Sequence, residues 1–190
     1  APVSLRAETF PDARTKLHAV RKAAGVRFLC LMAPRDDGEG RSVEVPAAGG
    51  GQTAAVVSPA GRDVVGGAVD AAATAGEMAT DAVAAAVSFG ADGGVRGYAA
   101  VSATLLDCRG RRFLASSGGS VHVVNDGTLI SVRGPGGARA ACLRLGAKRV
   151  SVNGVEGALR GSGETTEISI PVPARGWRYL VSRGGRRVAR

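Results

Sequence analysis

The feature that most constrains the fold is the stretch of residues 95–132, in which short apolar runs are separated by turn signals. The runs carry Val, Leu, Ile, Tyr and Phe, which suit the half-buried surface of a pleated sheet. Turn signals stand at Arg109-Gly110 and at Asn125-Asp126-Gly127, because Gly adopts a positive φ without steric cost and Asn or Asp tolerates one. They recur about every ten residues, which is typical of successive antiparallel strands. We therefore expect a β meander at the centre of the chain.

The composition extends this prediction to the whole chain. Hydrophobic residues make up 45% of the 190 residues, so the chain can bury a sizeable core. The 29 Gly and 8 Pro, many of them between apolar runs, favour many short strands over a helix bundle. The prediction is an all-β protein, an antiparallel β-sandwich of two packed sheets with more than ten short strands. Residues 1–25 are expected to form a lead-in segment, residues 26–182 the sandwich, and residues 183–190 a basic flexible tail.

Two segments leave the choice between strand and helix open. Residues 67–88 are rich in Ala, the best helix former, but Gly residues interrupt them and Thr80-Asp81 has the character of a turn. We favour two strands there, at 63–69 and 83–89, over a helix. Residues 14–22 could form a short helix or a strand. The remaining predicted strands are residues 26–33, 43–45, 53–58, 140–145, 150–153, 155–159, 166–170 and 177–181, with a two-residue hairpin at Asn153-Gly154.

The net charge of +9 and the isoelectric point near 10.7 favour acidic partners such as nucleic acid, anionic lipid or acidic polysaccharide. An alternative is that the charge reflects a genome that prefers Arg codons, since only three of the 25 basic residues are Lys. Binding of single-stranded nucleic acid would require exposed aromatic side chains among basic residues. Only Phe113 and the pair Trp177 and Tyr179 offer such a pattern, and we expect Trp177 and Tyr179 to lie in the core or on a sheet face. This argues against nucleic acid as the partner.

Residues that could carry chemistry are few. His122 alternates with apolar neighbours in a strand pattern, His18 lies in the lead-in segment, and a structural role is expected for both. Motifs of serine hydrolases, zinc proteases and nucleotide-binding loops are absent from the sequence. We expect no cofactor and no metal site, although the acidic loop at residues 36–39 could hold a structural calcium ion. No apolar segment reaches the roughly 18 residues that a membrane-spanning helix requires, so no membrane is expected as a partner.

The three cysteines are too few and too scattered for a disulfide framework or a zinc site. Each lies in or beside an apolar run, where a cysteine usually behaves as a small buried hydrophobe. A single disulfide would leave one thiol over, so the sequence leaves open whether any two of them pair. The three are Cys30, Cys108 and Cys142.

The order of several segments resembles the C-terminal β-sandwich of heparinase II/III-like polysaccharide lyases. The resemblance spans about residues 14–181, and it rests on segment order because none of the motifs is specific by itself. The segments are a strand ending in proline (28–34), Gly61-Arg62-Asp63-Val64-Val65, a strand pair about Thr80-Asp81, residues 98–107, Gly110-Arg111-Arg112-Phe113, and the late hairpin at 152–154.

The resemblance implies an accessory domain of a secreted or periplasmic lyase that acts on uronate-containing glycans. In that family an N-terminal α/α toroid supplies most catalytic residues, and the sandwich helps to line the substrate cleft and can supply a His. His18 is the candidate for that His, although no motif of the family matches it. The chain alone is expected to be inactive. The alternative is a free-standing carbohydrate-binding or structural sandwich with a basic surface that binds polyanions.

The candidate substrate contacts are Arg109, Arg111 and Arg112, because three arginines flank Gly110 at an expected hairpin tip. Arginine makes bidentate contacts to carboxylate or sulfate, which suits an acidic polysaccharide. A solvated turn is the alternative explanation for these charges. The basic tail, with Arg183, Arg186, Arg187 and Arg190, is the next candidate.

Overall fold

A computed structural model describes the chain except for residues 1–3, 10–14, 21–41, 45–50, 69–72 and 173–190. The chain divides into two compact units, Ala1–Cys30 and Leu31–Arg190, each of which is described by itself. In the first unit, β1 (Ser4–Thr9) and β2 (Thr15–Val20) form an antiparallel pair with Ser4 opposite Val20. The segment that the sequence left open between helix and strand is therefore a strand.

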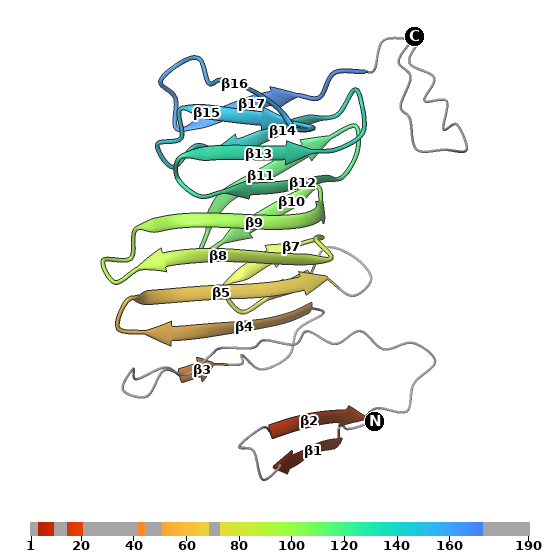
Figure 1. Ribbon diagram of the computed structural model, residues 1–190, viewed down its shortest axis with the longest axis vertical. Helices are drawn as coiled ribbons and strands as arrows, with labels where there is room; N and C mark the ends of the chain where they lie inside the picture. Colours follow the sequence, from red (N-terminus) through yellow and green to blue (C-terminus); the bar gives the residue numbers. More distant parts are fainter. Residues whose placement is uncertain (1–3, 10–14, 21–41, 45–50, 69–72, 173–190) are drawn as a thin grey trace, which may run out of the picture. The chain divides into compact units, whose positions relative to one another are not determined.

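The second unit is a β-sandwich, which confirms the predicted fold class (Figure 1). Its nine-stranded sheet has the order β16-β15-β13-β12-β9-β8-β5-β4-β3, and its six-stranded sheet has the order β17-β14-β11-β10-β7-β6. All pairs are antiparallel except β13 with β15. The described residues contain no helix. The strands not yet bounded are β3 (Ser42–Glu44), β4 (Gly51–Ser58), β5 (Gly61–Ala68), β6 (Ala73–Ala75), β7 (Met78–Thr80), β8 (Ala84–Gly90), β9 (Val95–Ala103), β10 (Leu105–Cys108), β11 (Arg111–Ser117), β12 (Val121–Asn125), β13 (Leu129–Arg133), β14 (Arg139–Leu143), β15 (Arg149–Val152), β16 (Val155–Ala158) and β17 (Thr165–Ser169).

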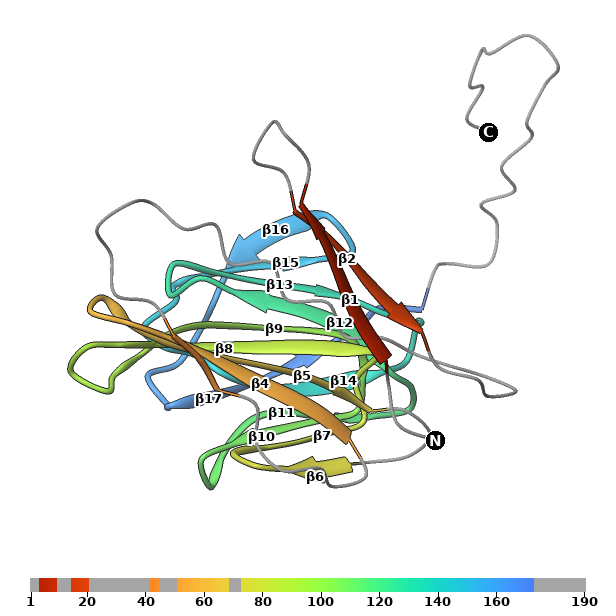
Figure 2. The ribbon, with the colours of Figure 1, turned by 90° about the horizontal axis from the view of Figure 1, so that it is seen from below.

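The predicted central meander is wrong in its pairing, although its strands are real. In a meander β9 would pair with β10, but β9 lies between β8 and β12, and β10 lies between β7 and β11 in the other sheet. The chain thus changes sheet after β9, again after β11, and again after β13 (Figure 2). Turn chemistry reveals where a strand ends, whereas the choice of its neighbour depends on packing between distant segments.

The Ala-rich segment forms strands, as predicted. The strands expected at 63–69 and 83–89 are β5 and β8, and they pair with each other with Val64 opposite Val87. Between them lie β6 and β7, which the sequence analysis did not foresee. Alternate residues of β8 are buried, including Ala85, Val87 and Phe89, so one face of an antiparallel sheet overrides the helix propensity of alanine.

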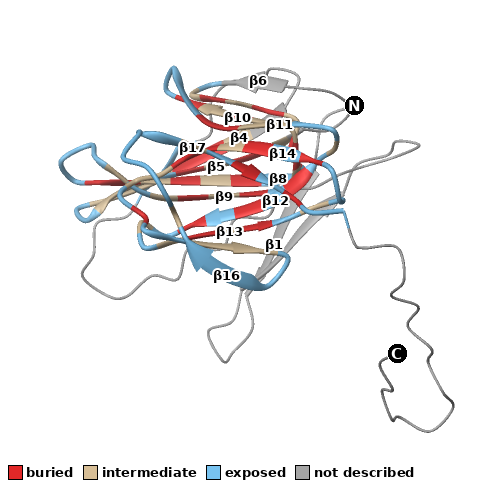
Figure 3. Cartoon of the chain, turned by 90° about the horizontal axis from the view of Figure 1, so that it is seen from above, coloured by how far each residue is buried: buried red, intermediate tan, exposed pale blue. Residues whose placement is uncertain are grey.

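One hydrophobic core lies between the two sheets and takes side chains from both (Figure 3). The largest fully buried side chains include Phe113, Met78 and Leu106 from the six-stranded sheet and Ile130 and Val87 from the nine-stranded sheet. The ring of Phe113 meets the ring of Tyr98 edge-on, with centroids 5.3 Å apart. Phe113 is 1% exposed and cannot offer the stacking surface that its basic neighbours suggested.

The connections give the sandwich two different ends. At one end, which we call the hairpin end, tight turns join β4 to β5, β8 to β9, β10 to β11 and β12 to β13, each within one sheet. At the opposite end, which we call the crossing end, the chain passes from sheet to sheet after β7, β9, β11 and β13. The segments after β14 and β16 also change sheet, but they do so at the hairpin end.

Asp81 holds two of the crossings together. Its carboxylate accepts hydrogen bonds from the backbone amide groups of Thr104 (2.8 Å) and Leu105 (2.8 Å) and from the Thr104 hydroxyl. Beside it, the Thr80 hydroxyl donates to the Leu105 carbonyl at 2.7 Å. Burial alone would raise the pKa of the Asp81 carboxyl, but these hydrogen bonds outweigh burial and lower the pKa below its ordinary value.

The predicted hairpin at Asn153-Gly154 is confirmed. It joins β15 to β16, and both of its central residues have positive φ, 50° for Asn153 and 89° for Gly154. Several predictions lie outside the described residues: the strands at 26–33 and 177–181, the acidic loop at 36–39, the domain boundaries at 25 and 182, the basic tail, and Cys30. Within the described part of the chain, no helix is both long and apolar enough to cross a membrane.

Candidate anion-binding site

The three predicted arginine contacts lie at the β10–β11 hairpin, as expected. The turn is tight because Arg109 (φ 52°) and Gly110 (φ 74°) both adopt the left-handed conformation. The Arg109 Nε lies 3.1 Å from the Glu77 Oε2, and its guanidinium carbon lies 5.2 Å from the centroid of the Phe89 ring. Glu77 also pairs with Arg62, so it bridges two arginines.

The other two arginines of this hairpin are also paired with carboxylates. Arg112 makes a bidentate contact to Asp107, with nitrogen–oxygen distances of 2.8 and 2.9 Å, and this hydrogen bonding raises the pKa of its guanidinium. Arg111 forms an ion pair with Glu164. Each predicted contact thus has an acidic partner within the chain. The hairpin presents less free positive charge than its sequence suggests.

A second basic group, which the sequence analysis missed, lies on the turn between β14 and β15. The Ala147 amide donates to the Arg144 carbonyl at 2.8 Å, and the two residues between them, Leu145 (φ 51°) and Gly146 (φ 86°), have positive φ. This is a type I′ turn, which suits Gly146 but strains a bulky residue such as Leu145. The turn places Arg144 and Lys148 on either side of Leu145-Gly146. In the sequence, the only local signal for this turn is a Leu-Gly pair between a predicted strand and a lysine.

Buried polar side chains fix the start of this turn. The Leu143 carbonyl accepts hydrogen bonds from the Tyr98 hydroxyl and from the Asn125 Nδ2, both at 2.8 Å. The Asn125 Nδ2 also donates to the Arg144 carbonyl at 3.1 Å. Tyr98 and Asn125 are 4% and 1% exposed, so these bonds are shielded from water and hold the backbone of the turn in place.

The Arg144 guanidinium is oriented by the backbone and not by a carboxylate. It donates to the Gly161 carbonyl and, at 3.2 Å, to the Ala147 carbonyl. Neither Arg144 nor Lys148 lies within ion-pair distance of a carboxylate among the residues that the structure describes. Arg144 therefore keeps its positive charge while its position is restrained, and Lys148 is exposed beside it.

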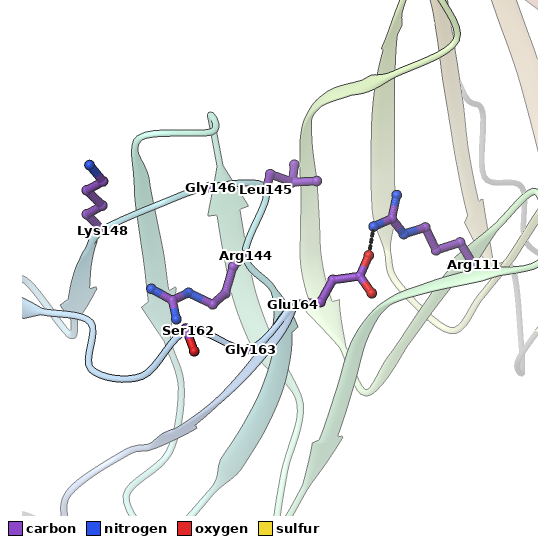
Figure 4. Close-up of a pocket in the computed structure, with 8 residues that line it drawn as sticks. All are labelled: Arg111, Arg144, Leu145, Gly146, Lys148, Ser162, Gly163 and Glu164. Carbon is purple, nitrogen blue, oxygen red and sulfur yellow. Dashed lines mark hydrogen bonds and ion pairs between the residues drawn. The ribbon is translucent and has the colours of Figure 1, made fainter.

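These residues surround a hollow of about 430 Å³ at the hairpin end, which we call the cationic hollow (Figure 4). Arg111 approaches Glu164 from the β10–β11 hairpin, while Arg144 and Lys148 lie toward the other side of the hollow. Three cationic side chains thus share one carboxylate, an excess of two positive charges. An anion entering this space meets donors whose charge is not neutralised by the protein. Of the three predicted arginines, only Arg111 lines it.

The other candidate residues do not join this site within the described structure. His18 belongs to β2 of the first unit, opposite Arg6, and its side chain is not described. His122 is exposed on β12. Burial raises the pKa of the Cys108 thiol to about 11 and that of the Cys142 thiol to about 12, so both unpaired cysteines remain protonated at neutral pH. Among the described residues, no group of three or more His, Cys, Asp or Glu side chains could hold a metal ion.

Comparison with known proteins adds no family assignment. No protein-family model matches the chain, and a search of curated proteins found no similar sequence.

Proposed function

We propose that the β-sandwich is a non-catalytic module that binds an acidic polysaccharide through the cationic hollow. The observation that carries this proposal is the pair Arg144 and Lys148, whose charges have no carboxylate partner among the described residues although Arg144 is held in place by two carbonyls. A restrained guanidinium loses little conformational freedom when it binds a carboxylate or a sulfate. The exposed Lys148 adds a second charge.

The described aromatic side chains favour a polysaccharide over a nucleic acid. Phe89, Tyr98 and Phe113 are all buried, at 6%, 4% and 1% exposure. They offer no face on which an unpaired base could stack, and stacking contributes much of the affinity for single strands. Charge recognition without stacking suits a chain of uronate or sulfated sugars.

We further propose that this module works beside a catalytic domain of a secreted or periplasmic polysaccharide lyase. The confirmed sandwich fold supports this, together with the resemblance in segment order to the sandwich of heparinase II/III-like lyases. In such a lyase a base removes the proton α to a carboxylate, and the developing charge must be neutralised. An α/α toroid encoded in the same reading frame would supply that chemistry, and the sandwich would gather the polyanion.

The binding proposal is tested with a charge-matched pair of variants. R144A/K148A should weaken binding to heparin, alginate and hyaluronan by about tenfold or more, because two charge-assisted contacts are lost. The control R133A/R139A removes the same charge from the crossing end and should change affinity by less than about twofold. Titration calorimetry at two salt concentrations provides the measurement, with dextran as the uncharged glycan. Equal losses in both variants would show that net charge, and not the hollow, binds the glycan.

The lyase proposal needs two separate measurements. The isolated chain, incubated with the same glycans, should release no unsaturated product that absorbs in the ultraviolet. The full reading frame should encode an α/α toroid before the sandwich. Turnover by the isolated chain would contradict a non-catalytic role. A native protein that begins near Ala1 and ends near Arg190 would favour a free-standing binding module.

A further inference from the structure

A second hollow lies at the hairpin end, next to the cationic hollow but with different chemistry. It encloses about 360 Å³ among the β4–β5, β8–β9 and β12–β13 turns. Its charged lining residues are Arg62, Arg96, Asp63 and Asp126, so cations and carboxylates are equal in number. We call it the mixed hollow. An anion would gain little there, because Arg62 is already paired with Glu44 and Glu77 and the hollow holds two further carboxylates beside Arg96.

A row of hydrogen-bonding groups crosses the floor of the mixed hollow. Asp63 on β5 lies opposite Ser88 on β8, and Ser88 lies opposite Gly97 on β9. Only glycine fits at position 97, because a Cβ there would lie 2.8 Å from the Asn125 carbonyl oxygen, at the start of the turn that carries Asp126. The row therefore presents a carboxylate and a hydroxyl on adjacent strands, beside a glycine against which the backbone of Asn125 and Asp126 packs closely.

Two charged residues that line the mixed hollow have unused hydrogen-bonding capacity. Within the described part of the chain, Asp63 and Arg96 take part in no ion pair or side-chain hydrogen bond, and both are exposed. A free carboxylate accepts hydrogen bonds from neighbouring hydroxyls, and a guanidinium donates to hydroxyl or ring oxygens. This combination matches the hydroxyl-rich surface of an uncharged sugar.

The two hollows adjoin at Gly127. A Cβ at Gly127 would lie 3.4 Å from the carbonyl oxygen of Arg96, which lines the mixed hollow, and 3.9 Å from that of Leu145, which lines the cationic hollow. Gly127 thus lies between a lining residue of one hollow and a lining residue of the other. A glycan chain lying over this turn can place successive sugars in the two hollows.

We propose that the mixed hollow binds an uncharged sugar of the same glycan whose acidic sugar occupies the cationic hollow. The inference rests on the proposed function, because it takes the cationic hollow as the first subsite. It names the preferred ligand class, an acidic polysaccharide in which charged and neutral units alternate. A chain with an acid on every unit brings a carboxylate against Asp63 and Asp126, and that repulsion selects against it.

The test compares two probes of equal length. Hyaluronan hexasaccharide alternates uronate with a neutral amino sugar, whereas alginate hexasaccharide carries a carboxylate on every unit. D63N/S88A should weaken hyaluronan binding by about fivefold, because that ligand uses those hydrogen bonds, and should not weaken alginate binding, because D63N also removes a carboxylate that repels it. E167Q/S169A, which removes one carboxylate and one hydroxyl from β17, should alter neither. Calorimetry is run in EDTA to remove metal-mediated contacts, and S88A alone, checked by circular dichroism, repeats the comparison with the charge intact.

The outcomes separate this inference from the proposed function. If R144A/K148A leaves the affinity for both hexasaccharides unchanged, the proposed function fails and this inference fails with it. If R144A/K148A weakens both but D63N/S88A weakens neither, or weakens both equally, the cationic hollow stands and the neutral subsite is wrong. Selective loss of hyaluronan affinity in D63N/S88A and in S88A supports the neutral subsite.

Discussion

Asp81 at the crossing end and the pair Arg144 and Lys148 at the hairpin end differ in whether their charges find partners within the described structure. At the crossing end, Asp81 accepts hydrogen bonds from Thr104 and Leu105 and so joins two sheet-to-sheet connections. At the hairpin end, Arg144 and Lys148 lie beside a hollow without a carboxylate partner in the described structure. The first arrangement stabilises the fold, and the second leaves charge free for a ligand. Mutations at the two ends should therefore act on different measurable quantities.

The largest expected effect is on stability and comes from the crossing end. Removal of the Asp81 carboxylate in D81A leaves the Thr104 and Leu105 amide groups without their acceptor, so the free energy of unfolding should fall by about 2–4 kcal/mol. Urea denaturation measures this loss. D92N provides the control, because Asp92 makes one hydrogen bond in the exposed β8–β9 turn and its replacement should have little effect.

The affinity of folded D81A for heparin at low temperature should equal that of the parent chain. A loss of affinity in proportion to the loss of stability would mean that the two ends are coupled.

Low pH should also destabilise the crossing end, because protonation removes the charge of the Asp81 carboxylate. The pKa of Asp81 is lowered in the folded chain, so its contribution to stability is present above the ordinary value of 3.8 and is lost as the pH falls through the lowered folded value. The urea midpoint of the parent should therefore decrease below about pH 4, and D81N should decrease less steeply. D126N is the comparison, since the amide groups of Leu129 and Thr128 lower the pKa of Asp126 at an exposed turn of the hairpin end. If the urea midpoints of D81N and the parent fall equally with decreasing pH, Asp81 is not the cause of the acid destabilisation.

Much of the fold could be predicted from sequence because turns and alternation are local signals. The hairpin at Asn153-Gly154 needs only two residues with positive φ, and the alternation in residues 83–89 reports one buried face. The pairing of β9 with β12 instead of β10 could not be predicted, because it depends on how the two sheets share one core. The strands β6 and β7 are three residues each, too short for alternation to show.

The candidate site was predicted less well, for a related reason. Three arginines close in sequence indicated an anion site, but the partner of Arg111 is Glu164, which lies 53 residues away. Arg144 and Lys148 were not predicted as site residues, because the sequence does not show that the carbonyls of Gly161 and Ala147 orient the Arg144 guanidinium. Charge is readable from sequence, whereas the neutralisation of that charge is a property of the tertiary structure.

The pair Arg111 and Glu164 tests whether a carboxylate within the hollow limits the binding of an anion. E164Q removes the carboxylate that offsets Arg111 and turns the hollow from three cations with one carboxylate into three cations alone. Affinity for heparin should rise by about threefold, and the rise should disappear at high salt because exposed charges are screened. E156Q is the control, since Glu156 pairs with Arg149 in the same way on β15 and β16. Unchanged affinity in E164Q would show that Arg111 does not contact the glycan.

The smallest expected effect comes from the rest of the arginine hairpin. Arg109 and Arg112 lie outside the cationic hollow and are paired with Glu77 and Asp107, so R109A/R112A should lower heparin affinity by less than about twofold. R111A alone should weaken binding more than R109A/R112A, although it removes one charge instead of two. Salt elution from a heparin column ranks the variants, and circular dichroism confirms that each is folded. If R109A/R112A elutes earliest, the hairpin tip binds the polyanion, as its sequence suggested. Binding would then require that the ion pairs of Arg109 with Glu77 and of Arg112 with Asp107 break so that both arginines contact the ligand.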